Sequence, residues 1–348
     1  MEQETQLLTP VEMEPFIASA QRMCAELDRL LLGRPALHRM VLVGILSQGH
    51  ILLEGLPGVG KTALVKALGD LLQLDYRRIQ CTPDLMPSDI LGTHILQQTS
   101  EGKREMEFQA GPIFTNILLT DEINRASPKT QSAMLEAMQE RTVTLMGQTR
   151  ALPQPFFVLA SQNPVELEGT YPLPEAQLDR FLFKLHVGHV DVPVLEELIT
   201  TRRHGSPPQP EWRCEKQTLL ELFSIIDRIF LPKPVARYIA RLVAATRPDA
   251  EESIEAIQQY VMYGASPRAA IAMAEAGRAH ALLEGRPTVG FEDIATVAPA
   301  ILNHRIILNY KARFDKVQHH ELLAELLKHL QQVHLQLSQD IEVREVVS

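Results

Sequence analysis

Short apolar runs alternate with helix-like segments over the first half of the chain. The runs occupy residues 51–53, 117–119, 156–159 and 182–185. Between them, apolar residues recur at three- and four-residue spacing, as on one face of a helix. Wholly apolar strands separated by helices are typical of a parallel sheet that is covered on both faces. The pattern therefore predicts an α/β domain over residues 1–190.

The pattern changes after about residue 190, where strand signals fade. Helical spacing of apolar residues continues over residues 217–228, 235–246, 267–283 and 291–303, with Pro and Gly between the segments. This predicts a smaller all-α domain over residues 191–335, followed by a C-terminal tail over residues 336–348. At the other end of the chain, residues 11–32 have the apolar stripe of an amphipathic helix.

Composition narrows the class of protein. With 348 residues, 45% hydrophobic and 22% charged, the chain has ordinary globular composition, which excludes disorder and fibrous classes. No apolar run reaches the roughly 18 residues of a membrane span, and the N-terminus lacks a signal pattern, so we expect a soluble, unprocessed protein. Three widely spaced cysteines fit neither disulfides nor metal motifs and indicate a reducing, cytoplasmic setting. A net charge of −9 argues against nucleic acid, although a local basic patch stays possible.

The first chemical motif follows the first apolar run. Residues 55–62 match G-x-x-x-x-G-K-[ST], a loop whose glycines let backbone N–H groups surround phosphates. Lys61 supplies a positive charge for the β- and γ-phosphates, and Thr62 offers a hydroxyl to Mg²⁺. ATP and Mg²⁺ are therefore the expected ligands. The expected nucleotide contacts are Gly55, Pro57, Gly58, Val59, Gly60, Lys61 and Thr62.

A pair of carboxylates follows the second apolar run. Asp121 stands where a strand of such a fold supplies a Mg²⁺ ligand, and Glu122 is placed to orient and deprotonate water. Alone, an Asp-Glu pair after a strand is more often a solvated turn before a helix. Joined to the phosphate loop, the pair favours hydrolysis over simple binding.

Longer motifs resemble the MoxR family of AAA+ ATPases. The resemblance lies in residues 111–114, 121–126, 131–141, 160–164 and 171–181, and it extends over about residues 32–303. It implies a P-loop AAA+ core, with a parallel sheet flanked by helices, and a smaller all-α lid domain. It also implies assembly into a homo-oligomeric ring, expected to be a hexamer, in which ATP lies between subunits.

The resemblance also implies roles for single residues. Asn163 matches the sensor-1 residue that helps to place the attacking water, and Arg268 matches sensor 2 at the start of a lid helix. Arg180 matches the arginine finger that reaches a neighbouring subunit's site, and Gly33 lies in a segment similar to the one that covers the adenine. The chemistry of arginine alone does not decide whether Arg180, Arg268 or Arg125 acts in trans.

Two insertions are predicted as β-hairpins, over residues 93–108 and residues 141–152. In the resembling family they correspond to the helix-2 insert and the pre-sensor-1 hairpin, which project from the ring and are associated with client contact. The alternative is that both hairpins only complete the fold or the contact between subunits.

The resemblance implies a chaperone-like ATPase that remodels or matures a protein client, often one with a von Willebrand factor A domain. Two alternatives stay open. One is a nucleic-acid motor or a magnesium-chelatase-type subunit, although the second hairpin offers only Arg141 and Arg150 as basic residues. The other is a scaffold that binds nucleotide without turnover, which intact Lys61, Asp121 and Glu122 argue against.

Overall fold

The chain forms two compact units in a computed structural model that describes residues 8–98, 104–165, 169–202 and 207–330. One unit spans Pro10–Arg228 and the other contains the chain from Ile229 onward. The division lies later than residue 190, where the sequence pattern changes, because the segment after 190 still packs on elements of the first unit. The backbone N–H of Cys214 donates to Leu71 O at 2.7 Å, for example. The tail expected over residues 336–348 lies outside the described residues.

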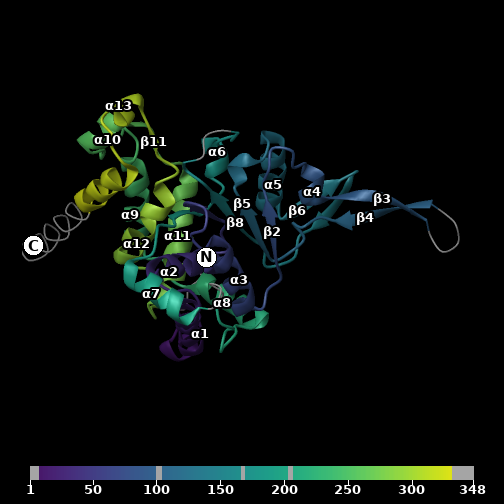
Figure 1. Cartoon of the computed structure of the whole chain (residues 1–348). Helices are drawn as coiled ribbons and strands as arrows, with labels where there is room; N and C mark the ends of the chain where they lie inside the picture. The colour runs from purple at the N-terminus through teal and green to yellow at the C-terminus, as the bar shows by residue number, and fades with distance from the viewer. Residues whose placement is uncertain (1–7, 99–103, 166–168, 203–206, 331–348) are drawn as a thin grey trace, which may run out of the picture. The chain divides into compact units, whose positions relative to one another are not determined.

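The first unit is built on a five-stranded parallel sheet, shown in Figure 1. Its strands, in spatial order, are β2 (Tyr76–Gln80), β5 (Ile117–Asp121), β8 (Phe157–Gln162), β1 (Ile51–Glu54) and β9 (Phe183–His186). Four of them are the predicted apolar runs. The sequence did not predict β2, because only Ile79 of this edge strand is buried and its other side chains are exposed.

Both faces of the sheet are covered, which explains why the inner strands are apolar throughout. On one face, Leu52, Leu118 and Val158 join a core cluster with α5 (Pro128–Glu140). On the other face, Phe157 contacts Phe223 of α8 (Lys216–Arg228), with ring centroids 6.4 Å apart. Successive side chains of a strand point to opposite faces, so each strand contributes to both cores.

The first unit contains further helices. They are α1 (Pro10–Leu30), α2 (Pro35–Leu46), α3 (Lys61–Leu72), α4 (Pro87–Leu91), the 3₁₀ turn η1 (Ile123–Arg125), α6 (Glu175–Leu178) and α7 (Val192–Thr201). The predicted N-terminal amphipathic helix is confirmed as α1, which buries an apolar stripe that includes Met23, Leu27 and Leu30. Helix α5 begins at Pro128, because the Ser127 side chain accepts a hydrogen bond from the Thr130 N–H and Pro128 occupies the first turn.

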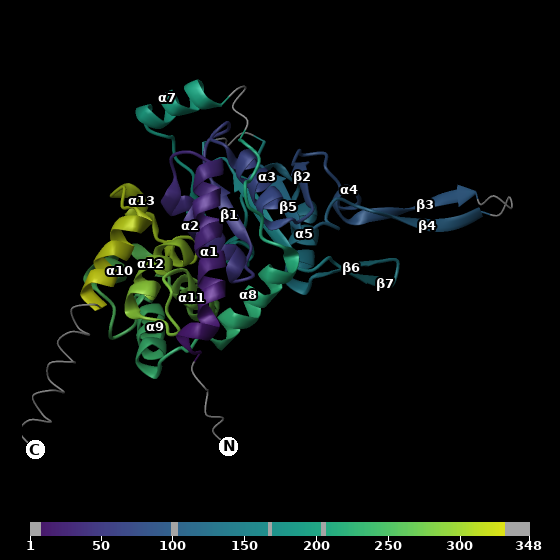
Figure 2. The ribbon, with the colours of Figure 1, turned by 90° about the horizontal axis from the view of Figure 1, so that it is seen from below.

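Both predicted hairpins are present, and Figure 2 shows them projecting in the same direction from this unit. The first pairs β3 (Gly92–Gln98) with β4 (Arg104–Ala110), and its expected turn at 99–102 falls outside the described residues. The second pairs β6 (Thr142–Leu145) with β7 (Gln148–Ala151). Its two-residue tip, Met146 and Gly147, has positive φ at both positions, as the twist of a hairpin requires.

The second unit is helical, as predicted. It contains α9 (Lys233–Ala245), α10 (Glu255–Tyr260), α11 (Pro267–Leu283), α12 (Phe291–Leu302), α13 (Tyr310–Phe314) and helical residues 319–330. The structure adds a short antiparallel pair, β10 (Val261–Tyr263) with β11 (Ile307–Leu308). Within the described ranges of the whole chain, the helices are all too short or too polar to cross a bilayer.

Candidate functional site

The phosphate loop connects β1 to α3. Gly60 has φ +96° and caps α3, a conformation that disfavours any side chain with a Cβ. Gly55 lies so close to the neighbouring backbone that a Cβ there would be 2.5 Å from Val187 O. Lys61, the first helical residue, is buried, and its Nζ donates to Gly55 O at 2.8 Å. The loop is thus folded tightly around its lysine.

The environment of Lys61 connects the loop to the carboxylate pair. Burial lowers the pKa of this lysine, and the negative charges of Asp121 and Glu122 oppose that effect. The two carboxylates therefore act on the charge of the loop lysine. The parallel topology brings Lys61, Asp121 and Glu122 together, because β1 and β5 end at the same edge of the sheet.

Asp121 is the last residue of β5, and its carboxylate is held by two neighbours. Arg78 Nη2 donates to Asp121 Oδ2 at 2.8 Å, and Ser161 Oγ makes a short hydrogen bond to Asp121 Oδ1. Arg78 lies on β2 and Ser161 on β8, the strands on either side of β5. The adjacent strands thus fix the orientation of this carboxylate.

Glu122 follows in a left-handed conformation, with φ +56° and ψ +51°. Its backbone N–H donates to Ser161 Oγ at 3.0 Å. Its Oε2 accepts from Gln80 Nε2 at 2.8 Å and from Arg125 Nη1 at 3.4 Å. Positive φ is uncommon for a residue other than glycine and is typical of positions constrained by function. Arg125, one of the three arginines considered for a trans role, therefore contacts Glu122 of its own chain.

The oxygens of Thr62 and Asp121 are the predicted metal ligands. Thr62 is an exposed hydroxyl in the first turn of α3, and Asp121 is a carboxylate at the end of the neighbouring strand. Mg²⁺ prefers oxygen ligands of this kind and keeps several waters. The chemistry of the donor set fits Mg²⁺ together with a bound phosphate.

The other predicted catalytic residues are in different surroundings. Asn163 follows β8, is buried, and accepts a hydrogen bond from the Val165 N–H at 3.2 Å. Arg180 is half-buried and its Nη1 donates to Leu135 O of α5 at 2.7 Å. Arg268 is exposed in the first turn of α11, in the second unit. The roles given to these three residues by resemblance stay predictions.

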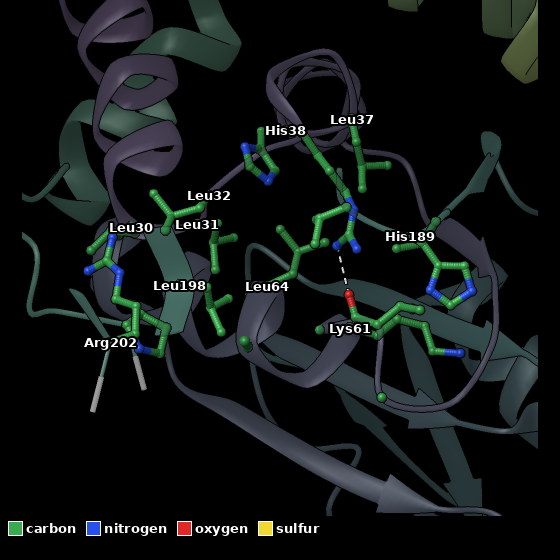
Figure 3. A pocket seen from close by; sticks show the side chains of 18 of the residues that line it. Leu30, Leu31, Leu32, Leu37, His38, Lys61, Leu64, His189, Leu198 and Arg202 are labelled. Atoms are coloured by element: carbon green, nitrogen blue, oxygen red, sulfur yellow. Dashed lines mark hydrogen bonds between the residues drawn. The ribbon is translucent and has the colours of Figure 1, made fainter. Parts of the chain in front are cut away.

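A cavity of about 640 Å³ lies beside the phosphate loop, and Figure 3 shows its walls. Most of the wall away from Lys61 is apolar, with Leu30, Leu31, Leu32, Leu37, Leu64, Leu195 and Leu198. Gly33, in the wall segment, has φ +86°, and a Cβ there would lie 2.4 Å from the Val194 side chain. The cavity thus has a cationic loop at one end and an apolar chamber at the other, which is the arrangement that a nucleotide needs.

Several polar residues of this site were not predicted. Arg34 lines the cavity and donates from Nη1 to Val59 O at 2.7 Å, and its buried Nε has no hydrogen-bond partner among the residues that the structure describes. Burial lowers the pKa of Arg34. Burial also lowers the pKa of His38, against the effect of Asp28, whose Oδ1 lies 2.6 Å from His38 Nδ1. Arg34 could have been found from the sequence because it directly follows Gly33. For Ser161, the only sequence signal was that a polar residue stands in an apolar strand.

Known proteins match the chain over both units. A family model described as the ATPase family associated with various cellular activities (AAA) matches residues 50–183, and a model of the AAA lid domain matches residues 253–326. Chaperone MoxR1 of Mycobacterium tuberculosis is 43% identical over 86% of this chain and 79% of its own length. The uncharacterised protein YeaC of Bacillus subtilis is 40% identical over 91% of this chain and 94% of its own. A crystal structure of a candidate ATPase from Cytophaga hutchinsonii is 41% identical, with a TM-score of 0.83 over 91% of this chain and 96% of that one.

Proposed function

Because this chain belongs to the MoxR family of AAA+ ATPases, we propose that it hydrolyses ATP and uses the energy to remodel or mature a protein client. One observation carries the proposal of hydrolysis. Glu122 stands next to Asp121, and both carboxylates act electrostatically on the lysine of the phosphate loop. A site that only bound nucleotide would have no need for a second carboxylate in this position.

In the proposed reaction, the phosphate loop and Lys61 hold the β- and γ-phosphates of ATP, and the apolar chamber takes the adenine. Glu122 accepts the proton of the attacking water, and Asn163 helps to place that water. Thr62 and Asp121 hold Mg²⁺, which when bound neutralises phosphate charge. Gln80 and Arg125 fix Glu122 Oε2 before attack, so the carboxylate does not need to be ordered during the reaction.

The two remaining arginines have proposed roles at the γ-phosphate. Arg268 acts as sensor 2 from the helical unit. Arg180 acts on the nucleotide of a neighbouring subunit, and an arginine in such a position contributes about 10³ to 10⁵ in rate. Activity then requires a homo-oligomeric ring, which we propose to be a hexamer. Arg180 Nη1 donates to Leu135 O, a backbone carbonyl of α5, and this hydrogen bond supports a fixed orientation of the Arg180 side chain.

The client is proposed to be a protein, in particular a protein with a von Willebrand factor A domain. The name Chaperone MoxR1 of the mycobacterial relative supports work on a protein partner. The proposed setting is the reducing cytoplasm. The three free cysteines support this.

The test is Glu122→Gln, which keeps the size of the side chain and removes the proton acceptor. The variant should bind ATP with unaltered affinity, release phosphate at least about 100-fold more slowly, and retain the client in affinity capture with ATP present. Glu136→Gln, which changes an exposed carboxylate on α5, is the matched control and should behave as the unaltered protein. Phosphate release at the normal rate from Glu122→Gln would refute the assignment of the base. Capture of nucleic acid instead of protein would refute the proposed client class.

A further inference from the structure

Three side chains from three strands join the two hairpins. The guanidinium carbon of Arg150, on β7, lies 4.0 Å from the ring centroid of Phe108 on β4. Arg150 Nη2 also lies 3.5 Å from Nε2 of His94 on β3. His94 and Phe108 are directly opposite in the β3–β4 register, with ring centroids 5.4 Å apart. One side chain of the second hairpin therefore contacts both strands of the first.

The position suits an arginine in particular. Its planar guanidinium stacks on an aromatic face and keeps donors at its edge for hydrogen bonds. Arg150 is half-buried, which strengthens attraction between a cation and a ring. Its Nη1 lies 3.5 Å from Gln148 O on the same strand, so the side chain is also oriented from its own hairpin.

The second hairpin is rooted in α5. Strand β6 begins two residues after α5 ends, and the Leu152 N–H donates to Arg141 O at 2.9 Å to close the base of the hairpin. Within α5, Gln131 Nε2 donates to Ile123 O at 3.2 Å and to Ala126 O at 3.1 Å. Ile123 lies in the 3₁₀ turn η1, which follows Glu122, and Ala126 is the residue that caps the end of this turn. A single helix thus carries the hairpin and holds the turn after the proposed base.

The first hairpin is rooted beside the strand that ends in Asp121. The Phe108 ring contacts Phe114, with centroids 5.6 Å apart, and Phe114 packs against the core cluster of α5. At the hairpin base, a Cβ on Gly111 would lie 2.2 Å from Ile90 O, so the backbones there are in direct contact. The close backbone contact at its base limits movement of this hairpin. A displacement that does occur passes through Phe108 and Phe114 to the core cluster of α5.

We propose that Arg150 is a positioning residue that fixes the two hairpins as one arm, and that α5 transmits displacement of this arm to the turn holding Glu122. A two-stranded ribbon attached at one end bends easily on its own. The Arg150 contact lies near the roots of both hairpins, at the third residue pair of β3–β4 and the second pair of β6–β7, so it fixes the angle between the two ribbons there and a load on either tip is shared by both roots. The joining of the hairpins is independent of the proposed function, whereas the transmission to Glu122 rests on the proposed ATPase activity.

Spin labels on the two hairpins measure the first part of the proposal. Labels attached at Gln97→Cys on β3 and Met146→Cys at the other tip, both exposed positions, give an inter-label distance distribution by pulsed electron paramagnetic resonance. Cys24→Ser removes the one native cysteine that is not buried, and Cys81 and Cys214 are buried. An excess of unlabelled protein ensures that each assembly contains at most one labelled chain.

Arg150→Met should widen this distance distribution at least about twofold, because it keeps a long apolar side chain but removes the cation and its donors. Arg150→Lys should restore part of the narrow distribution. Arg104→Met removes an exposed arginine from β4 and is the matched control, with no expected change. An unchanged distribution in Arg150→Met overturns the proposal that Arg150 joins the hairpins.

ATP turnover measures the second part. In Arg150→Met, kcat should fall at least about threefold with KM for ATP unchanged, and Arg150→Lys should recover most of it. If Arg150 only stabilised the fold, Arg150→Met and Arg150→Lys would both show a lower unfolding temperature and a smaller fraction of active protein. A normal kcat beside a widened distribution overturns transmission through α5. Absence of turnover in the unaltered protein would refute the proposed function instead, while the label distances would still decide whether Arg150 joins the hairpins.

Discussion

His50, the residue before β1, should make the stability of the first unit depend on pH. Its ring bridges two elements, because Nδ1 accepts from the Val158 N–H at 3.0 Å and Nε2 donates to Met138 O at 3.1 Å. Burial lowers its pKa from 6.5 to about 4, the Met138 carbonyl opposes this effect, and the charge of Arg141 adds to it. Protonation would place a proton on Nδ1 against a backbone donor, so the native state favours the neutral ring.

The sign and size of the effect follow from linkage. Below pH 6.5 the unfolded chain binds a proton at His50, whereas the native state does not bind it until about pH 4. The free energy of unfolding therefore falls as the pH falls from 6.5 to about 4. The two pKa values differ by about 2.5, and at about 1.36 kcal/mol per unit the full loss is about 3.4 kcal/mol. At pH 4.5 about 2.5 kcal/mol of it should already be lost.

The assay is urea unfolding followed by tryptophan fluorescence between pH 4.5 and 7.5. The chain has one tryptophan, Trp212, which lies in the first unit with Arg22 5.0 Å from its ring, so the signal reports on the unit that contains His50. The comparison is His50→Asn, which does not titrate and can keep an acceptor for the Val158 N–H. This variant should be less stable at pH 7.5, because it loses the hydrogen bond to Met138 O, and the difference should shrink by about 2.5 kcal/mol at pH 4.5.

Subtracting the two pH profiles removes the contribution of carboxylates that titrate in both proteins. Parallel profiles for the unaltered protein and His50→Asn would refute the reasoning, because the pKa of His50 would then be the same in the folded and unfolded states. A gap that widened towards low pH would show the opposite sign and refute it equally.

Three further outcomes are expected. Lys61→Ala should weaken ATP binding at least about tenfold in a fluorescent-nucleotide titration, because it removes the buried charge of the phosphate loop, and normal affinity would contradict the assignment. Mixtures of Arg180→Ala and Glu122→Gln subunits should recover part of the ATPase rate if Arg180 acts in trans, and no recovery at any ratio would indicate a cis role. Asp293→Asn should destabilise the helical unit by about 3 kcal/mol in calorimetry, because the buried carboxylate loses its pairing with Arg286. Burial alone would raise the pKa of Asp293, but hydrogen bonds lower it, so the unaltered protein should approach the variant's stability as acid protonates this carboxyl group.

The parts of the fold that the sequence predicts are those with strong apolar periodicity. Four strands of the sheet, several of the long helices and both hairpins follow from local pattern. Strand β2 was missed because it lies at the sheet edge and buries only Ile79. Helices α10 and α13 are six and five residues long, too short to show a helical stripe. The compact unit ends later than the predicted boundary at residue 190, since α8 has the same amphipathic pattern as the lid helices but packs on Phe157.

The candidate site divides in the same way. The phosphate loop and the pair Asp121 and Glu122 are contiguous in sequence, so their chemistry is visible without a structure. Ser161, Gln80 and Arg34 reach the site from separate segments, and a single polar residue in an apolar strand carries no motif. Their contribution depends on strand order, since β2 and β8 become functional neighbours of β5 only once the sheet has formed.

The edge position of β2 has a consequence for solubility. An edge strand offers unpaired backbone N–H and C=O groups to any passing strand, and aggregation often begins there. In β2 the exposed side chains include Arg77, Arg78 and Gln80, which keep this edge charged and hydrated. Arg78 and Gln80 are also the residues that hold Asp121 and Glu122. Selection for turnover at this site would therefore also preserve a barrier against self-association, and loss of both residues would expose the protein to two failures at once.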